Sequence, residues 1–226
     1  NTGIDGAANL AWKIAASVQG WAGASLLASY EIERKPVAHR NTAAARSLTQ
    51  RVSGVDVPDG IEETGENGDR TRGEFGVVLQ DFRGQFTSIG VELGARYDGS
   101  PIVTGDGEPP SDDPLIYRPT SVPGGRLPHF WLGSASAGYA RRSVFDVMHT
   151  GFTLLRIGAD APRAEGFSIA AKRRGVPLKV VDVPSLMAWN LYQTRMILVR
   201  PDQHIAWRGD RMPDDAGKIL DRAVGH

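Results

Sequence analysis

The order of apolar segments after residue 150 is the strongest constraint on the fold of this chain. A buried-strand pattern, FTLLRIG, begins at Phe152, and a helical segment follows Pro162 and ends near Gly175. PLKVVDV, at residues 177–183, predicts a second strand. TRMILVRP and HIAWRG predict two more strands joined by a tight PDQ turn, which indicates an antiparallel hairpin. A last amphipathic helix carries Ala216, Ile219, Leu220 and Ala223 on one face.

The order β-α-β followed by β-β-α is that of a thioredoxin-like core. Such a fold usually owes its chemistry to a Cys pair at the start of its first helix. Here the corresponding segment is GADAPRAEG, residues 158–166, and the chain contains no Cys. This absence excludes disulfides, thiolate metal sites and thiol redox chemistry. We therefore predict a Cys-free thioredoxin-like domain.

The first fifty residues are predicted to be helical, with helices over 5–19, 24–35 and 37–52. Two glycines in QGWAG separate the first helix from the second, and Pro36 is expected to separate the second from the third. The first helix has apolar residues at helical spacing on one face: Ala7, Leu10, Ala11, Ile14, Ala15 and Val18.

The middle of the chain gives weaker signals. Residues 56–74 hold seven acidic and two basic residues and predict a mobile surface loop. IGVELGARY alternates apolar and other residues, which predicts a strand at about 89–97. Residues 104–126 are dense in Gly, Pro and Asp and indicate a domain boundary. We expect an α/β (α+β) chain with one domain over 1–110 and the thioredoxin-like domain over 111–226.

The charge balance argues against nucleic acid as a partner. Lys plus Arg and Asp plus Glu both number 26, so no basic surplus is present to neutralise phosphates. The sequence has neither an apolar run long enough to span a bilayer nor a charged-then-apolar leader. We expect a soluble, cytoplasmic protein without a membrane partner.

Few side chains form a pattern that predicts chemistry. The five histidines have no partner at helical spacing, so no metal site is predicted, and the hydrolase motif Gly-x-Ser-x-Gly is absent. Glu31, Glu33 and Arg34 could take part in acid–base chemistry, but on a helix we favour a charged face that pairs with its neighbours. His204 and Trp207 alternate on the predicted hairpin, which favours a structural role. No catalytic residue is predicted.

Asn1, Thr2 and Gly3 lead into the first predicted helix. A helix N-terminus presents backbone N–H groups and the positive end of the helix dipole, so it attracts anions and electron-rich oxygens. A glycine at this place lets a ligand approach the backbone closely. The residues alone leave two interpretations open, an ordinary helix cap and a cofactor site.

Two stretches match a longer pattern. NTGIDGAANLAWK fits Asn-x-Gly-Ile-x-Asp-Ala-x-Asn-Leu-Ala-Trp-Lys except at Gly6, and SYEIERKPVA fits Ser-Tyr-Glu-x-Glu-Arg-x-Pro-Val-Ala. Both patterns resemble the FAD-dependent aromatic hydroxylases, the single-component flavin monooxygenases that include phenol, chlorophenol and polyketide hydroxylases. Gly6 departs from the family, which usually has Asp there. VELGARYDGSPIV, GGRLPHFWL, GFTLL and ILVRPDQHIAWRG are similar to the C-terminal half of the same family, including its thioredoxin-like appendage.

The resemblance implies an oxidoreductase that uses FAD, NAD(P)H and O₂ to hydroxylate an aromatic small-molecule substrate. It places Asn1, Thr2 and Gly3 at the pyrimidine edge of the flavin ring, where reduced flavin carries negative charge that a helix N-terminus stabilises. The family's Gly-x-Gly-x-x-Gly segment for the dinucleotide is not in this sequence. We therefore expect a C-terminal fragment of a monooxygenase that is inactive alone and does not retain FAD.

An alternative hypothesis is a non-catalytic thioredoxin-like module that serves interaction or dimerisation and binds no flavin. With either hypothesis we expect self-association, because helices that pack on another domain expose apolar surface without it.

Overall fold

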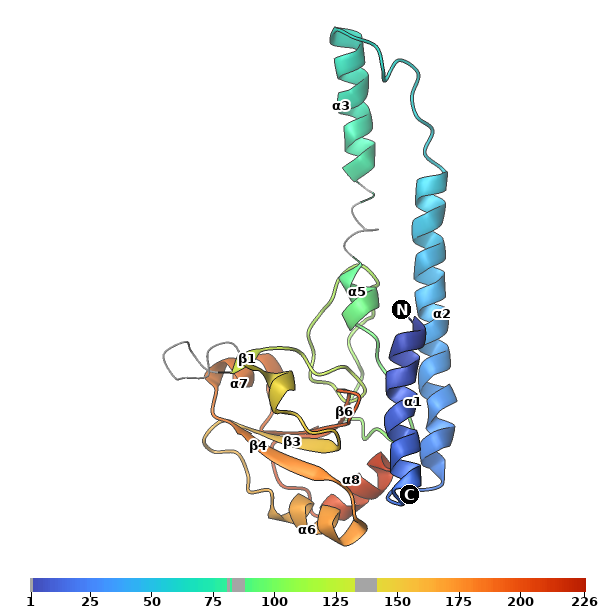
Figure 1. Ribbon diagram of the computed structural model, residues 1–226. Coiled ribbons are helices and arrows are strands. Elements are labelled where there is room, and N and C mark those ends of the chain that lie inside the picture. Colours follow the sequence, from blue (N-terminus) through green and yellow to red (C-terminus); the bar gives the residue numbers. More distant parts are fainter. Residues whose placement is uncertain (1, 81, 83–87, 133–141) are drawn as a thin grey trace. The chain divides into compact units, whose positions relative to one another are not determined.

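The computed structural model describes residues 2–80, 82, 88–132 and 142–226 (Figure 1). Its backbone divides into two compact units. The first unit comprises Asn1–Val37, Ala95–Ser111 and Pro119–His226, and the second comprises Ala38–Gly94 and Asp112–Arg118. This division differs from the predicted boundary near residue 110, since the first helices share a unit with the C-terminal half. The division into 1–110 and 111–226 stays a prediction.

The first unit contains a four-stranded sheet in the spatial order β4-β3-β5-β6. Its strands are β3 (Phe152–Ile157), β4 (Leu178–Val183), β5 (Met196–Val199) and β6 (Ile205–Gly209). Strand β3 pairs parallel with β4, whereas the β3–β5 and β5–β6 pairs are antiparallel. The crossover between β3 and β4 contains helix α6 (Glu165–Arg174). The predicted strands, the hairpin and the thioredoxin-like order of elements are therefore confirmed.

Apolar side chains cover both faces of this sheet. Along β3, Phe152 and Leu154 belong to one buried cluster, whereas Leu155 and Ile157 belong to another. Successive side chains of a strand point to opposite faces, so a strand covered on both sides is apolar at nearly every position. This explains why FTLLRI reads as a continuous apolar run rather than as an alternation.

Short elements complete the C-terminal half. Helix α8 (Ala216–Ala223) was predicted, and its Leu220 is completely buried. Helix α7 (Leu186–Tyr192) was not predicted, although Ser185 caps it by accepting a hydrogen bond from the Ala188 N–H at 3.3 Å. Two short strands, β1 (Trp131–Leu132) and β2 (Arg142–Ser143), pair antiparallel, and the 3-10 helix η2 (Val144–Val147) follows them.

Helix α1 (Thr2–Val18) lies alongside the first turns of helix α2 (Ser25–Ser53) (Figure 1). Helix α2 continues through Pro36, so the prediction of separate helices over 24–35 and 37–52 was wrong. Proline removes one backbone hydrogen bond and crowds the preceding turn. Glu33, Arg34 and Val37 are buried on both sides of Pro36, and these contacts offset the local cost.

The second unit contains the rest of α2 and helices α3 (Glu66–Gln80) and α5 (Ile89–Leu93). The predicted strand at about 89–97 was wrong, because α5 occupies its first half. A side chain at Gly90 would place its Cβ 1.9 Å from the Asp113 carbonyl oxygen, and the Arg40 guanidinium donates to the Gly90 carbonyl at 2.7 Å. Close packing of the backbone here outweighs the alternating pattern of side chains.

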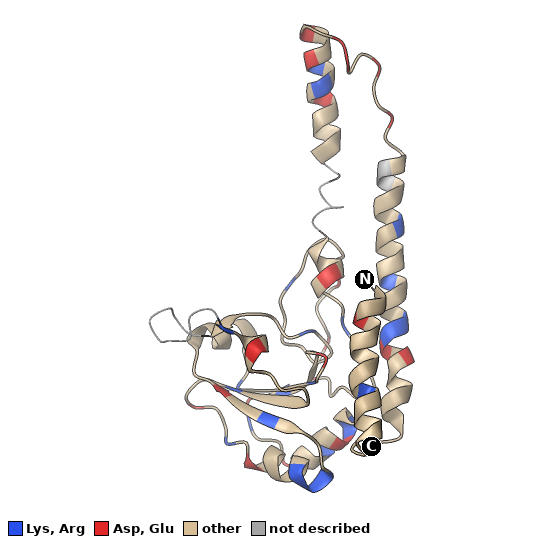
Figure 2. Cartoon of the chain, viewed as in Figure 1, with Lys and Arg blue, Asp and Glu red and all other residues tan. Residues whose placement is uncertain are grey.

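The predicted loop over 56–74 was wrong for residues 66–74, which lie in α3. Acidic and basic residues are interspersed along the first turns of this helix (Figure 2). Glu66 and Asp69 lie in its first turn, where the helix dipole favours negative charge, and Arg72 pairs with Asp69 at 2.6 Å. No helix within the described ranges has both the length and the apolarity needed to cross a bilayer.

Candidate functional site

The first turn of α1, residues 2–5, contains two of the three predicted cofactor contacts. Thr2 and Gly3 are exposed, whereas Asn1 lies outside the described residues. A Cβ built on Gly3 would meet no atom within 4 Å, so a ligand can approach this backbone. The N–H groups of a first helical turn have no acceptor within the helix and lie at the positive end of its dipole. This set of donors fits an electron-rich or anionic edge of a cofactor.

Arg34 of α2 holds the first turn from the protein side. Its guanidinium forms an ion pair with Asp5 at 2.7 Å and donates to the Thr2 carbonyl at 3.4 Å and to the Tyr97 hydroxyl at 3.1 Å. Burial lowers the pKa of Arg34, but Tyr97 and Asp5 more than offset this, so the net change in its pKa is upward. Arg34 is therefore a fixed positive charge beneath the turn.

Gly6, the departure from the hydroxylase pattern, lies against the same arginine. Its Cβ would be 3.3 Å from the Tyr30 hydroxyl and 3.9 Å from Nε of Arg34. An Asp at this position would thus point at Arg34. In this chain Asp5, at the preceding position, supplies the carboxylate that pairs with Arg34.

Tyr97 connects Arg34 to the hairpin formed by β5 and β6. Its ring stacks on His204 with a centroid distance of 4.1 Å and an interplanar angle of 27°, and the Arg200 guanidinium lies 5.0 Å from the ring centroid. Burial, reinforced by the charge of Asp202, raises the pKa of Tyr97, so its hydroxyl stays protonated. Tyr97 is 2% exposed, and it contacts Arg34 through its hydroxyl and His204 and Arg200 through its ring.

Glu33 accepts hydrogen bonds from three separate parts of the chain. It accepts from Lys13 at 2.7 Å, from Asn9 at 2.9 Å, from Ser100 at 2.6 Å and from the two terminal nitrogens of Arg200 at 2.6 and 2.9 Å. Burial raises the pKa of Glu33, but Arg200 and Lys13 more than offset this and hold the pKa at about 2. The bidentate geometry and the additional donors are what a buried ion pair requires.

Lys13, Glu33, Arg200 and Asp202 together form what we call the buried charge cluster. Arg200 also binds Asp202 at 2.6 and 3.0 Å. Burial raises the pKa of Asp202, and Arg200 and His204 lower it by more, so Asp202 is ionised. Burial also lowers the pKa of Lys13, partly offset by the charge of Glu33. Two positive and two negative charges balance within the cluster, which makes its burial tolerable.

The sequence-based interpretation of the acidic residues on α2 is correct for one of them only. Glu31 is exposed and pairs with Lys35 at 3.2 Å, as expected for a charged helix face. Glu33 and Arg34 are buried instead, so the prediction of a charged surface face was wrong for them. His204 and Trp207 have structural contacts, the latter with Phe167 at 5.2 Å. Within the part of the chain that the structure describes, no three potential metal ligands come together.

A pocket of about 560 Å³ borders the first two turns of α1. Ile4, Asp5 and Ala8 line it from the helix, and Arg126 and residues 201–204 line it from the other side. The turn of the hairpin and the start of α1 therefore share one concave surface.

Two family descriptions match this chain. Residues 120–226 match "aromatic-ring hydroxylase, C-terminal", and residues 1–45 match "FAD binding domain". The chain therefore belongs to the FAD-dependent aromatic-ring hydroxylases, and the resemblance found in the sequence is confirmed.

Named relatives agree with this family. The chain is 34% identical to the FAD-dependent monooxygenase apdD of Emericella nidulans, over 100% of this chain and 38% of the relative. It is 29% identical to phenol 2-monooxygenase of a Pseudomonas species, over 97% of this chain and 41% of the relative. The chain thus spans about two fifths of the length of these relatives.

Solved structures agree as well. The rebeccamycin biosynthetic enzyme RebC with reduced flavin is similar with a TM-score of 0.87 and 37% identity, over 100% of this chain and 41% of that one. Aklavinone-11 hydroxylase in complex with FAD and aklavinone is similar with a TM-score of 0.69 and 28% identity, over 100% of this chain and 40% of that one.

Proposed function

We propose that the whole protein is an FAD-dependent monooxygenase that uses NAD(P)H and O₂ to hydroxylate an aromatic substrate of the phenolic or polyketide type. The observation that carries this proposal is the exposed first turn of α1, whose sequence is that of the hydroxylase pattern and whose backbone is open at Gly3. Relatives named as phenol and polyketide hydroxylases support the substrate class. No residue of this chain is proposed as a catalytic base.

In this proposal Asn1, Thr2 and Gly3 lie at the pyrimidine edge of the flavin. FAD, when bound, supplies the redox chemistry and the activation of oxygen. The first turn of α1 contributes backbone donors and the positive end of the helix dipole, which stabilise negative charge at that edge. Arg34 binds this turn through the Thr2 carbonyl and the Asp5 carboxylate.

The same proposal limits what this chain can do alone. It covers about two fifths of its relatives, and the family's dinucleotide-binding glycines are not in its sequence. We infer that this chain binds FAD weakly or not at all and that it self-associates through apolar side chains of α1 and α2. We also infer that the whole protein is cytoplasmic.

The activity is tested by supplying the whole protein with FAD, NADH or NADPH, and a panel of phenols and polycyclic aromatic polyketides. The proposal expects oxidation of the nicotinamide that depends on one class of aromatic compound, with a product heavier by one oxygen atom. Nicotinamide oxidation that no aromatic compound stimulates, together with no oxygenated product, would contradict it.

The cofactor contact is tested separately by Gly3→Ala. Because the new methyl group would meet no atom of this chain within 4 Å, the fold should be unaffected. In the whole protein the methyl group would lie on the proposed flavin side, and we expect the FAD dissociation constant to rise about tenfold or more. Gly73→Ala, on exposed α3 with equally open space, is the matched control and should leave FAD affinity unchanged.

A further inference from the structure

We propose that Arg34 and Tyr97 are positioning residues for the first turn of α1, so that the hairpin of the thioredoxin-like domain helps to set the properties of the flavin. This inference rests on the proposed function, because it gives the first turn its ligand. It assigns to a Cys-free domain a role in the flavin site of the same protein.

The contact between Arg34 and the first turn is direct. The guanidinium binds the Thr2 carbonyl and the Asp5 carboxylate, which belong to the same turn as Gly3. The Arg34 side chain is 6% exposed, whereas the Asp5 side chain is 48% exposed. A buried arginine that binds a backbone carbonyl fixes the turn more firmly than a solvent-exposed pair would, because its own position is determined by packing.

Tyr97 determines where that guanidinium lies. Its hydroxyl accepts a hydrogen bond from Arg34, and its ring is held by stacking on His204 and by the Arg200 guanidinium. Arg200 and His204 flank the turn between β5 and β6. The hairpin is therefore connected to the first turn of α1 through two side chains, Tyr97 and Arg34.

This connection has a consequence for the flavin. The donors and the dipole of a helix N-terminus act over the length of about one turn, so their effect on a bound group depends on its distance and direction. Displacement of a catalytic geometry by about 1 Å can lower a rate on the order of 100-fold. A first turn that loses its support should stabilise reduced flavin less, which makes the flavin harder to reduce.

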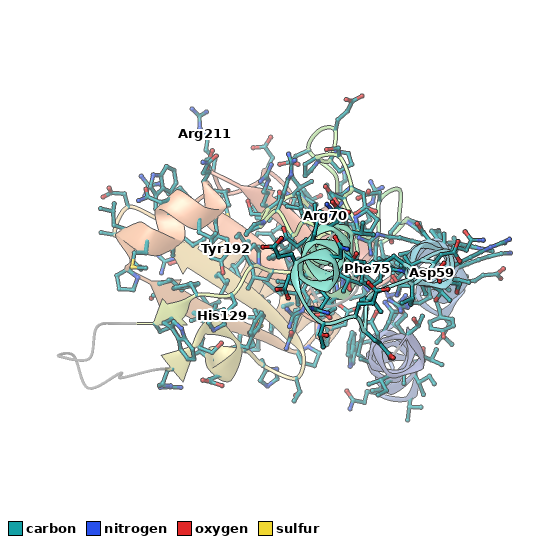
Figure 3. All side chains as sticks on the ribbon, turned by 90° about the horizontal axis from the view of Figure 1, so that it is seen from above. Asp59, Arg70, Phe75, His129, Tyr192 and Arg211 are labelled. Atoms are coloured by element: carbon teal, nitrogen blue, oxygen red, sulfur yellow. The ribbon has the colours of Figure 1, made fainter. Side chains whose placement is uncertain are left out.

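Tyr97→Phe is the sharpest test, because it keeps the stacked ring and removes only the hydroxyl that Arg34 binds. Its matched control is Tyr192→Phe. Tyr192 is also completely buried, lies in the apolar cluster on the sheet (Figure 3) and donates its hydroxyl hydrogen to the Pro128 carbonyl at 2.6 Å. Each variant thus removes one buried hydroxyl, but only one of the two hydroxyls contacts Arg34.

Three quantities are measured in the holoenzyme: the flavin reduction potential, the FAD dissociation constant, and kcat and KM for the aromatic substrate. For Tyr97→Phe we expect a more negative potential, an FAD dissociation constant raised several-fold, and a lower kcat with KM for the aromatic substrate unchanged. Tyr192→Phe should leave the potential and the FAD dissociation constant at the wild-type values.

A measurement without flavin accompanies these. Amide hydrogen exchange in the apoprotein should be faster over residues 6–8, whose N–H groups donate to carbonyls of the first turn, in Tyr97→Phe than in Tyr192→Phe, while β3 and β5 stay protected in both. Arg34→Lys is a second variant, which keeps the test usable if Tyr97→Phe does not fold. It keeps the positive charge, but its single ammonium group cannot bind Tyr97, Thr2 and Asp5 at once as the guanidinium does. It should shift the flavin reduction potential and the hydrogen exchange in the same direction as Tyr97→Phe.

The outcomes separate the two proposals. If wild-type protein takes up no FAD, the proposed function fails and this inference fails with it. If wild-type protein binds FAD, but both Tyr97→Phe and Arg34→Lys match Tyr192→Phe in potential and in hydrogen exchange, only the positioning role is overturned.

Discussion

Glu33 shows how one residue joins segments that lie far apart in the sequence. It receives hydrogen bonds from Lys13 of α1, from Ser100 and from Arg200 at the end of β5. Each of these donors brings its own segment against α2. The carboxylate of Glu33 is thus the common acceptor on which the packing of α1, α2 and the hairpin depends.

Replacing this carboxylate tests its contribution to stability. Glu33→Gln keeps the size of the side chain but leaves Lys13 and Arg200 with Asp202 as their one remaining negative partner in the buried charge cluster. We expect the free energy of unfolding to fall by about 3–5 kcal/mol, because a buried charge is left uncompensated. Glu31→Gln, on the same helix in an exposed pair with Lys35, should change it by less than about 1 kcal/mol. Urea denaturation of both variants measures the difference, and equal midpoints would contradict the assignment.

Acid should destabilise the protein through the same carboxylate. The folded-state pKa of Glu33 is lowered from 4.5 to about 2, so its contribution to stability is fully present above about pH 4.5 and is lost as the pH falls toward 2. A shift of this size corresponds to about 3 kcal/mol. Asp202 acts in the same direction. Unfolding free energies from pH 6 to pH 2 should show a steeper loss in wild type than in Glu33→Gln, and parallel curves would refute the prediction.

At the scale of elements, the turn between α1 and α2 packs directly on the C-terminal end of the described chain. The Gly23 N–H donates to the Val224 carbonyl at 2.7 Å, and the Ser25 N–H donates to the Gly225 carbonyl at 3.0 Å. A Cβ on Gly23 would lie 2.3 Å from the Gly225 carbonyl carbon. Two backbone segments meet here without side chains between them, which only glycine permits.

Gly23→Ala should therefore separate these two segments. We expect a loss of about 1–3 kcal/mol in unfolding free energy, as is typical of overpacking in a buried place. Gly3→Ala, in the same compact unit and with open space around its Cβ, is the control and should cost nothing. Thermal or urea unfolding distinguishes the two, and a Gly23→Ala variant as stable as wild type would show that the close approach has no energetic importance.

The sequence predicted those elements whose local pattern agrees with their packing. Strands β3 to β6 and helices α6 and α8 were identified, because burial on both sheet faces and on one helix face is visible in the residues themselves. Helix α7 has only seven residues, too few for a clear period. In α5, Ile89, Val91 and Leu93 fit a strand as well as a short helix, and contacts from Asp113 and Arg40 decide between them.

The site was only partly predictable for a related reason. The positions of Thr2 and Gly3 came from the family pattern, since a helix start by itself does not identify a ligand. Glu33 and Arg200 are separated by 167 positions, and no local pattern in the sequence indicates that they pair. The matching segments SYEIERKPVA and ILVRPDQHIAWRG were both recognised, but their contact in space was not.

At the scale of the whole molecule, large apolar side chains are exposed on the helices next to the proposed flavin turn. Ile4 is 74% exposed and Val18 is 82% exposed on α1. On α2, Leu27 and Ile32 are also exposed. Exposed large apolar side chains on two neighbouring helices favour contact with another protein segment.

Self-association of this chain should follow from these side chains. We expect an apparent mass in light scattering that rises with concentration, and a smaller rise in the double variant Ile4→Ser, Val18→Ser. The variant Val57→Ser replaces an exposed apolar residue of the second unit and is the control. A monomer at all concentrations would contradict the prediction.

The most direct test of the account is an FAD titration of the whole protein and of this chain side by side, followed by flavin fluorescence and absorbance. In the proposed function the first turn of α1 lies at one edge of a flavin that other parts of the protein hold. We therefore expect the whole protein to take up one FAD per chain tightly, whereas this chain alone should take up FAD weakly or not at all. Tight, stoichiometric uptake by this chain alone, or no uptake by the whole protein, would contradict it.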